Sequence, residues 1–537
     1  MKRKFWIGVL LCLVSNSRVN AQAPALKGEL SLSLRQAIEL ALERNPDLEI
    51  QKIRLDQARE QINERKGNYD SLINFRTLAG RRDNVIASRF YPTGLYIDTE
   101  QSQSISYESK TTMGGRFNIA LDYRRLVSTS NTQTLSPQYS AVLNFTMTQS
   151  LLRDFGRGVG MTQIRVAEKG KQIAEQNVYY RVSQLVHEVE EAYWSLNFLR
   201  QNLDSRKRSL EFARALLKQN ETLLNAGRVA PVSVLQTRSG VALHEEEVLT
   251  AESQMKKFED RLKSLLRIDL STASINPVNT PELQTVALDP VRSVEDALES
   301  RPEFQALQRE VERREIERKF AANQTRPRLD ATVQYGVAGL AGTPNPTCLD
   351  PTFFFCEPVG SNVNGTVFAD QKRPQDALTS MFSRRPFDAW TVEVKFQMPL
   401  GSRSAKSRLA EADLELLEAQ TRLRSLRDQI ESEIRDATRE TLAAQKRIDA
   451  SRQNVAFVED HLEGTRRKFE AGLSSSYDVL QVLEEADKAR TIEHKAVMDF
   501  NVGQSKLRLA EASTLEKYNI AIDFDARRRP ASGTNAR

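Results

Sequence analysis

The chain has 537 residues, enough for several domains or for one very elongated one. Charged residues make up 28% of it and aromatic residues only 7%, a mixture that suits long solvated helices better than a thick globular core. The net charge of +6 includes four cations in the N-terminal segment, and elsewhere basic and acidic residues are interspersed, which argues against a nucleic-acid partner.

The N-terminus has the pattern of an export signal. Basic residues at 2–4 precede an apolar stretch at 5–14, and small residues follow, so we predict a signal peptide at 1–21. Cys12 lies inside the apolar stretch and follows a leucine, which argues against lipid attachment. After this segment no run of about 18 apolar residues occurs, so the exported chain is expected either to be soluble or to cross a membrane as strands.

The rest of the sequence is internally duplicated. Two landmarks recur in the same order: ALERNPDL at Ala41–Leu48 with ALESRPEF at Ala297–Phe304, and Ala-Gly followed by Val-Leu-Gln at 226–236 and again at 471–481. The duplication predicts a first structural repeat at 22–268 and a second at 293–520. A linker rich in Pro and Thr, 269–292, joins them, and a disordered tail is expected at 521–537.

In the first repeat the pattern predicts a helix at about 33–67 that breaks at Asn45-Pro46. A β region at 71–150 follows, in which apolar and polar residues alternate, for example from Phe117 to Tyr123. The stretch 83–138 is long, and it either forms an external hairpin or adds two strands. A long helical hairpin is predicted at 160–268.

The second repeat predicts the same elements. A helix is broken at Arg301-Pro302, a β region covers 328–398, and a helical hairpin covers 401–516. The loop at 341–388 is expected to be external and contains Cys348 and Cys356. Export implies an oxidising compartment, which favours a local disulfide between these cysteines over two free thiols.

Both helical hairpins carry heptad seams, in which apolar residues recur in steps of three and four. In the first hairpin the seam residues are Val178, Val182, Leu185, Val189, Ala192, Leu196, Leu199 and Leu203. In the second, Leu409, Leu416, Leu423, Ile430, Ala437 and Ala444 recur in steps of seven, and Ala412, Ala419 and Leu426 accompany them. The predicted fold class is therefore mainly α with β: a duplicated repeat of helix, strand hairpin and long helical hairpin.

The strand pattern has two interpretations. The alternating segments can form a soluble sheet packed on one side, or a membrane wall with lipid on the apolar face and a water-filled lumen on the polar one. Counting about two spanning strands per repeat gives four or so per chain, too few to close, and an open edge in lipid leaves backbone groups without partners. A membrane location would therefore require several copies of the chain.

The duplicated pattern resembles the TolC family of outer-membrane efflux and secretion channels over about 33–520. The resemblance rests on the Ala-Leu-Glu-Arg-Asn-Pro opening, the short strand pairs between long helices, and the Ala-Gly…Val-Leu-Gln helix turn. It implies a homotrimer in outer-membrane lipid, with a 12-stranded β-barrel (more strands if 83–138 adds two) and an α-helical barrel in the periplasm. It also implies a periplasmic adaptor and an inner-membrane pump as partners.

The resemblance places the functional residues in the helix turns. The adaptor-contacting tips would be Ala226, Gly227, Arg228 and Pro231 in the first hairpin, and Ala471, Gly472, Leu473 and Ser474 in the second. Of the family's two constriction positions, Asp478 matches an acidic residue, and the second falls on Gln481, so a ring of fewer charges is implied. The alternative for Asp478 is a helix-capping or solvating role.

We expect no enzyme. His187, His244, His461 and His494 are scattered, and neither a metal nor a cofactor motif is present in the sequence. The function implied is the exit duct of a tripartite efflux or type I secretion system, carrying small molecules or proteins to the exterior. The rival hypothesis is a soluble, exported periplasmic coiled-coil scaffold.

Overall fold

The computed structural model describes residues 29–87, 94–130, 133–271, 274–281, 290–345, 372–382, 387–522 and 524. The chain forms two compact units. A helical unit comprises Met1–Glu49, Arg181–Ala297 and Ile430–Arg537, and a sheet unit comprises Ile50–Tyr180 and Leu298–Gln429. The predicted signal peptide, both predicted disulfide cysteines and most of the predicted tail lie outside the described residues.

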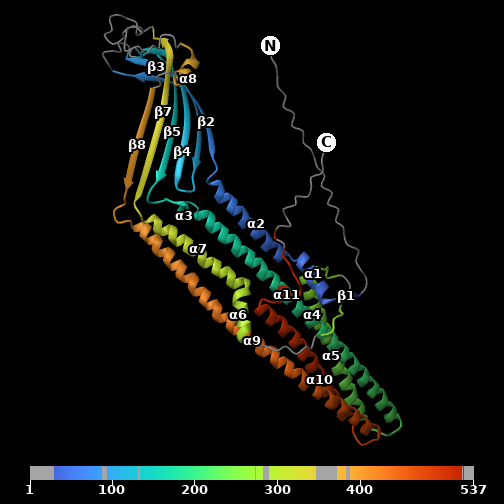
Figure 1. Cartoon of the computed structure of the whole chain (residues 1–537). Helices are drawn as coiled ribbons and strands as arrows, with labels where there is room; N and C mark the ends of the chain where they lie inside the picture. Colours follow the sequence, from blue (N-terminus) through green and yellow to red (C-terminus); the bar gives the residue numbers. More distant parts are fainter. Residues whose placement is uncertain are drawn as a thin grey trace, which may run out of the picture. The chain divides into compact units, whose positions relative to one another are not determined.

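The sheet unit contains one antiparallel sheet of six strands in the order β2-β3-β4-β5-β7-β8 (Figure 1). Their bounds are β2 Leu72–Val85, β3 Leu95–Lys110, β4 Gly115–Ser128, β5 Leu135–Ser150, β7 Arg328–Pro344 and β8 Phe387–Gln397. The sequence had suggested about four strands and left two more open. The stretch 83–138 provides the additional two, because β3 and β4 pair within the same sheet as their neighbours.

The sheet is apolar on one face and polar on the other, as the alternation predicts. In β8, Trp390, Val392 and Val394 lie on the apolar face, and Thr391 and Glu393 lie between them on the other. Because side chains alternate along every strand, the paired residues of neighbouring strands share a face. The exposed large apolar side chains of neighbouring strands therefore lie side by side on one face of the sheet.

One element within the predicted external loop 341–388 is a helix. Helix α8 (Pro374–Ser380) packs on the apolar face, where Ala377 and Met381 form a buried cluster with Ala141 and Ala341. A Cβ at Gly339 would lie 2.0 Å from the Ala377 carbonyl oxygen, so only glycine allows the helix to come this close. The sequence did not reveal this helix, because a seven-residue helix is too short to give a helical period.

The helix preceding each group of strands breaks where the sequence predicts. Helices α1 (Leu34–Arg44) and α2 (Pro46–Gly67) meet at Asn45, whose Oδ1 accepts from the backbone N–H groups of Asp47 and Leu48 at 2.9 and 3.2 Å. In the second half, α6 (Pro290–Ser300) and α7 (Pro302–Gln324) meet at Arg301. Proline occupies the first helical position after both breaks, where no backbone donor is needed.

The segment before β2 and the segment after β5 are in contact. Helix α2 leads into β2, and β5 leads into the short helix α3 (Arg157–Gly160). The Tyr69 hydroxyl, just after α2, donates a hydrogen bond to the Gly160 carbonyl oxygen at the end of α3. The chain therefore enters β2 and leaves β5 at the same end of the strands.

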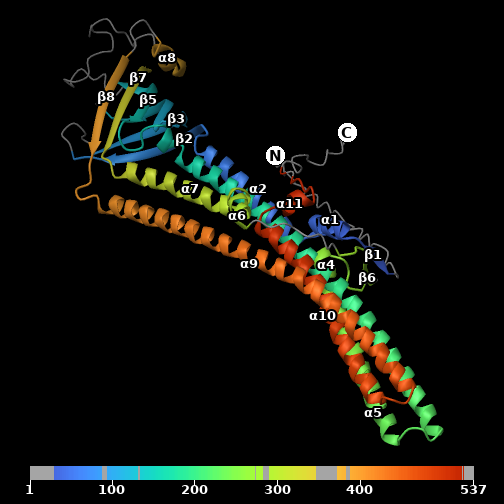
Figure 2. The same cartoon turned by 60° about the horizontal axis from the view of Figure 1, so that its bottom comes forward.

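Four long helices follow the sheet segments: α4 (Thr162–Asn225), α5 (Pro231–Leu266), α9 (Arg403–Glu470) and α10 (Ser476–Ala510) (Figure 2). Every predicted seam residue of α4 from Val178 to Leu203 is buried, which confirms the heptad pattern. In α9, Ile430, Ala437 and Ala444 are buried. None of the described helices has an apolar stretch of membrane-spanning length.

The helical unit also contains a small parallel sheet in which β1 (Leu30–Leu32) pairs with β6 (Ile275–Pro277). The Tyr193 hydroxyl of α4 is buried beneath this pair and donates to the Leu32 carbonyl oxygen at 3.0 Å. The last helix of the described residues is the short α11 (Thr514–Lys517). The predicted linker at 269–292 therefore contains a strand that joins both ends of the first repeat.

Candidate functional site: the helix-turn tips and a buried polar cluster

The turn between α4 and α5 is closed by a left-handed glycine. Gly227 has φ of +67°, its N–H donates to the Leu224 carbonyl, and the Arg228 N–H donates to the Leu223 carbonyl, both at 2.9 Å. These two bonds satisfy carbonyls that the end of a helix would otherwise leave without donors. Pro231 then opens α5 at its first position. The predicted tip is thus a well-defined structural element.

The turn between α9 and α10 repeats this geometry. Gly472 has φ of +73°, its N–H donates to the Phe469 carbonyl at 2.9 Å, and the Leu473 N–H donates to the Lys468 carbonyl at 2.8 Å. The Ala-Gly landmark of the duplicated sequence therefore corresponds to one bonding pattern used twice. In both turns the dihedral angle requires a residue that tolerates positive φ.

Asp478 caps the start of α10. Its Oδ2 accepts from the Ser475 N–H at 2.8 Å and from the Ser474 hydroxyl at 2.9 Å, and its own N–H donates to the Ser475 hydroxyl at 3.2 Å. The Ser475 N–H, followed by the two hydroxyls, lowers the pKa of the Asp478 carboxyl below its ordinary value. Asp478 is therefore both a cap and an exposed negative charge, and Gln481 is exposed one turn later.

Apolar side chains surround both tips. Val232 and Leu235 are exposed on the first turn of α5, and Leu473 and Tyr477 are exposed beside Gly472. Isolated exposed apolar residues are common, but here they lie at the ends of both hairpins, together with the polar tip residues. The tips therefore combine fixed backbone geometry with an accessible apolar surface suitable for contact with another protein.

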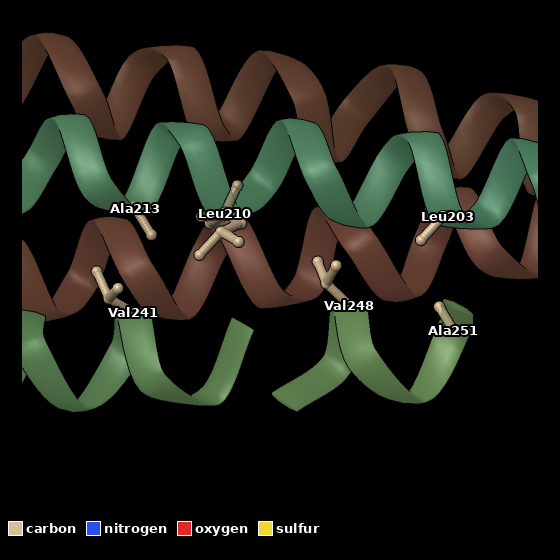
Figure 3. Packing of buried hydrophobic residues seen from close by; sticks show 7 residues of the cluster. Leu203, Leu210, Ala213, Val241, Val248 and Ala251 are labelled. Atoms are coloured by element: carbon tan, nitrogen blue, oxygen red, sulfur yellow. The ribbon is translucent and has the colours of Figure 1, made fainter. Parts of the chain in front are cut away.

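Behind the tips, the two hairpins pack against each other through small and branched apolar side chains. Figure 3 shows Leu203, Leu210 and Ala213 of α4 facing Val241 and Val248 of α5, and Leu483 of α10 belongs to the same buried cluster. Nearer the turns, Val479 of α10 and Phe469 of α9 pack with Leu216 of α4. This packing fixes the position of one tip relative to the other.

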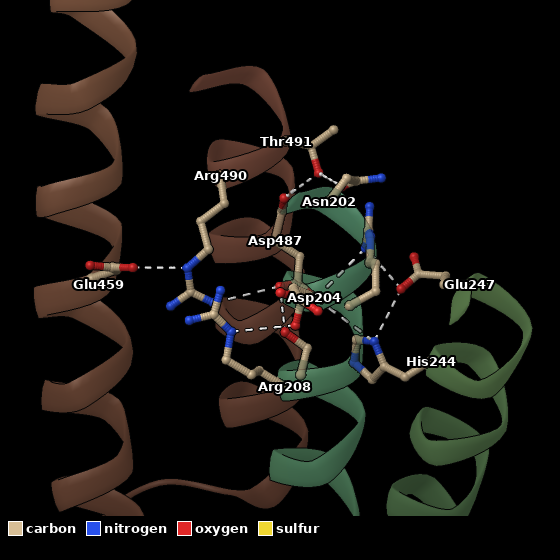
Figure 4. Close-up of polar contacts among 11 residues, drawn as sticks. Asn202, Asp204, Arg208, His244, Glu247, Glu459, Asp487, Arg490 and Thr491 are labelled. Carbon is tan, nitrogen blue, oxygen red and sulfur yellow. Dashed lines mark hydrogen bonds and ion pairs between the residues drawn. The ribbon is translucent and has the colours of Figure 1, made fainter. Parts of the chain in front are cut away.

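A charged residue lies within this packing. Asp487 of α10 (Figure 4) is almost completely buried. Its Oδ1 accepts from the Ser209 hydroxyl of α4 at 2.5 Å. Its Oδ2 has no hydrogen-bond partner and lies 3.7 Å from Arg206 Nη1 and 3.9 Å from His244 Nδ1. Burial raises the pKa of the Asp487 carboxyl, although Ser209 and the neighbouring cations act in the opposite direction.

Surrounding charges connect Asp487 to all four long helices. Arg206 donates to Glu247 Oε2 at 2.8 Å, and His244 Nδ1 lies 3.1 Å from the same oxygen. On the other side, Arg490 Nη1 lies 3.7 Å from Asp487 Oδ1, and Arg490 Nε donates to Glu459 of α9 at 2.8 Å. We call these six residues together with Ser209 the polar cluster.

The sequence analysis missed this cluster, because it treated His244 as one of four scattered histidines. In fact His244, Glu247 and Asp487 bring potential metal-ligand atoms within 4.8 Å of one another. Arg206 lies 2.8 Å from Glu247 and 3.7 Å from Asp487, so both carboxylates already have a cationic partner. A signal was present: Val234, Thr237, Val241, His244 and Val248 step by three and four, which places the histidine in the α5 seam.

The fold and the paired tips define a duplicated protein that contains one six-stranded sheet and two long helical hairpins. Residues 116–266 and 293–512 match the model of the outer membrane efflux protein family, and the chain belongs to that family. It is an outer-membrane efflux channel whose helical part lies in the periplasm.

Several solved structures have a similar fold. The CmeC outer membrane channel of Campylobacter jejuni is 14% identical with a TM-score of 0.63, over 92% of this chain and 90% of that one. VceC of Vibrio cholerae is 17% identical with a TM-score of 0.61, over 89% and 95%. The open state of MtrE of Neisseria gonorrhoeae is 14% identical with a TM-score of 0.56, over 89% and 88%. No curated protein matches the chain in sequence.

Proposed function

We propose that this channel works as a homotrimer and forms the exit duct of a tripartite efflux or type I secretion system. It would carry small molecules or proteins from the periplasm and an inner-membrane pump to the exterior. The observation that carries the proposal is the exposed apolar face of the sheet, since a soluble sheet buries such a face against a core. We expect no catalysis, because transport through a duct requires a lined passage and no reacting group.

The apolar face suits contact with lipid. Trp390, Val392, Val394 and Phe396 of β8 are all highly exposed on one side, and Thr391 lies on the other side with charged residues after it. Alternation of apolar and polar residues along strands of this length is the pattern of a membrane wall around water. Phe382, at the end of α8, is also exposed and extends the apolar surface over that helix.

The tips are the proposed contact for a periplasmic adaptor. Two backbone hydrogen bonds close each turn and hold its conformation, so little conformational entropy is lost when another protein binds there. The exposed Val232, Leu235, Leu473 and Tyr477 supply apolar contact area, and Arg228 supplies charge. Exchange of Leu235 and Leu473 for serine should weaken capture of the adaptor and leave trimer assembly intact.

Asp478 is the proposed selectivity residue of the periplasmic entrance, with Gln481 one turn further. Because its hydrogen bonds keep the carboxyl ionised, three copies around one axis would attract cations and repel anions. Asp478→Asn keeps an oxygen that can accept the capping bonds but removes the charge. Planar-bilayer recordings should show reduced cation preference for this variant, and unchanged selectivity would remove Asp478 from the constriction.

The proposal as a whole is tested by fractionation and reconstitution. The full-length protein should need detergent for extraction, migrate as a stable trimer, and open ion-conducting pores in planar bilayers. Release with the soluble periplasm, without pore activity, would instead favour the coiled-coil scaffold hypothesis. A variant with Val392→Lys should lose membrane assembly, and the matched variant Thr391→Lys on the polar face should keep it.

A further inference from the structure

The described sheet has two edges of similar character. Within the part of the chain that the structure describes, β2 pairs with β3 alone and β8 with β7 alone. Ile73 and Trp390 on these edge strands are each 73% exposed, whereas Ile119 and Phe145 inside the sheet are 40% and 38% exposed. The difference arises because an interior side chain has a neighbouring strand on both sides, and an edge side chain has one.

Apolar residues cross the whole width of the sheet in register. One row contains one apolar side chain from each strand and follows the paired residues: Ile73, Tyr107, Ile119, Phe145, Tyr335 and Trp390. Strands β2 and β3 therefore continue the apolar surface of β5, β7 and β8 around this row, at Ile73 and Phe75 and at Ile105 and Tyr107. Farther along the two strands the same face carries polar residues, among them Arg81 and Gln101. A hairpin standing outside the membrane would have no reason to continue that surface.

We propose that all six strands belong to the membrane wall and that β2 of one copy pairs with β8 of the next. Three copies would then close a wall of eighteen strands rather than twelve. This inference rests on the proposed function, since it assumes a trimer in the outer membrane. It assigns the two sheet edges as the surface that binds a second copy of this chain.

Strand direction permits this closure. The sheet is antiparallel throughout and has an even number of strands, so β2 and β8 run in opposite directions. An antiparallel ladder can therefore continue from β8 of one copy to β2 of the next without a change of pattern. Closure also supplies hydrogen-bond partners for edge backbone groups, which lipid cannot do.

The hydrogen-bonded register argues against a narrower wall. In a four-stranded arrangement β2 would pair directly with β5, with β3 and β4 outside. Instead, β2 is paired with β3 from Leu72 to Val85, and β4 is paired with β5 from Gly115 to Leu126. Because barrel diameter grows roughly linearly with strand number, the wall would be about one and a half times as wide as one of twelve strands. A wider exit accommodates bulkier cargo at this level.

Disulfide cross-linking of the full-length protein tests the edge pairing. In a background with Cys12, Cys348 and Cys356 changed to serine, single cysteines on the polar face of β2, at Asn74 or Arg76, are combined with Thr391→Cys, Glu393→Cys or Lys395→Cys on β8. At least one combination should link two copies under mild oxidation, because paired strands bring Cα atoms within reach of a disulfide. The pair Asn74→Cys with Ser106→Cys is the control, since these residues face each other within one chain.

The narrower wall predicts a different set of links. If β3 and β4 lay outside the membrane wall, β2 would pair with β5. Arg76→Cys would then form a disulfide within one chain with Val142→Cys, or with a cysteine two residues before or after Val142 on the same face of β5. In the six-stranded sheet, β3 and β4 separate these positions, so no such link should form. Links from β2 to β5, or absence of any link from β2 to β8 while the control pair forms, would overturn the inference.

Electron microscopy of the detergent-purified oligomer gives an independent count. Eighteen strands in the wall would support the inference. Twelve strands in a membrane trimer would overturn it and leave the exit duct standing. A chain that forms no membrane oligomer would remove the proposed function, and the inference with it.

Discussion

The two units of this chain use apolar residues in opposite ways. In the helical unit, seam residues such as Leu196 and Ala213 are completely buried between helices, and most charged side chains apart from the polar cluster lie outside. In the sheet unit, Trp390 and Val392 point away from the protein, and the polar residues lie on the other face. Helices in water need apolar residues only where they touch one another, whereas a wall in lipid needs them on its outer surface. The apolar residues of one chain are therefore arranged for water around the helices and for lipid around the sheet.

The largest effect is expected from breaking the helical side of this comparison. Leu196→Pro removes a backbone hydrogen bond inside α4 and adds a steric clash, at a cost of about 3 kcal/mol or more. The variant should fail to form a trimer that survives gel electrophoresis. Leu400→Pro is the control, because Leu400 is fully exposed before α9 begins, and it should assemble normally.

The sheet side is tested by a charge on each face. Val392→Lys places an ammonium group on the apolar face, where a lipid environment should cost about 2–4 kcal/mol. Thr391→Lys places the same group on the polar face and should cost little. The amount of heat-stable oligomer in the outer membrane measures the difference, and equal losses for the two variants would mean that the apolar face does not contact lipid.

Two aspartates on α10 sharpen the comparison within the helical unit. Burial raises the pKa of Asp487, so its contribution to stability is complete below the unfolded-chain pKa of about 3.9 and is lost as pH rises through the folded-state pKa. Hydrogen bonds lower the pKa of Asp478, so its contribution is present above that value and is lost as pH falls.

The two asparagine variants should therefore shift in opposite directions. As pH rises, Asp487→Asn should gain thermal stability relative to the unmodified protein, and Asp478→Asn should lose it. Each unit of pKa difference corresponds to about 1.4 kcal/mol for a buried group such as Asp487. Thermal unfolding of detergent-solubilised protein over a pH series measures both. Parallel slopes for the two variants would contradict the assigned environments.

The smallest effect concerns the turns. Gly227→Ala or Gly472→Ala forces a side chain into a left-handed conformation, at a cost of about 1 kcal/mol each. The control is Gly464→Ala inside α9, where a Cβ meets nothing within 4 Å and alanine is the better helix former. The melting temperature should therefore fall for the turn variants and rise for the control.

Most of the fold could be predicted from the sequence, because helices and strands produce a local periodicity of apolar residues. The α4 seam and the breaks at Asn45 and Arg301 depend on neighbouring residues, so the sequence alone located them correctly. The number of strands could not be settled that way, because only pairing between β3 and its neighbours shows that 83–138 belongs to the sheet.

The candidate site was predicted unevenly for the same reason. The Ala-Gly turns are local, and their positions were predicted to the residue. The polar cluster depends on Ser209, His244 and Asp487, which are far apart in the sequence and meet through packing of the two hairpins. The sequence signal for such a cluster is a histidine or aspartate at a seam position, where an apolar residue is expected.

The contact between Tyr69 and Gly160 has a consequence for how such proteins can be rebuilt. Because the chain enters β2 and leaves β5 at the same end of the strands, a strand pair can be inserted or removed between them without redirecting the segments that follow. The number of strands in the membrane wall and the residues of the helix-turn tips can thus be changed independently. An engineer could widen the wall and leave the tips unchanged.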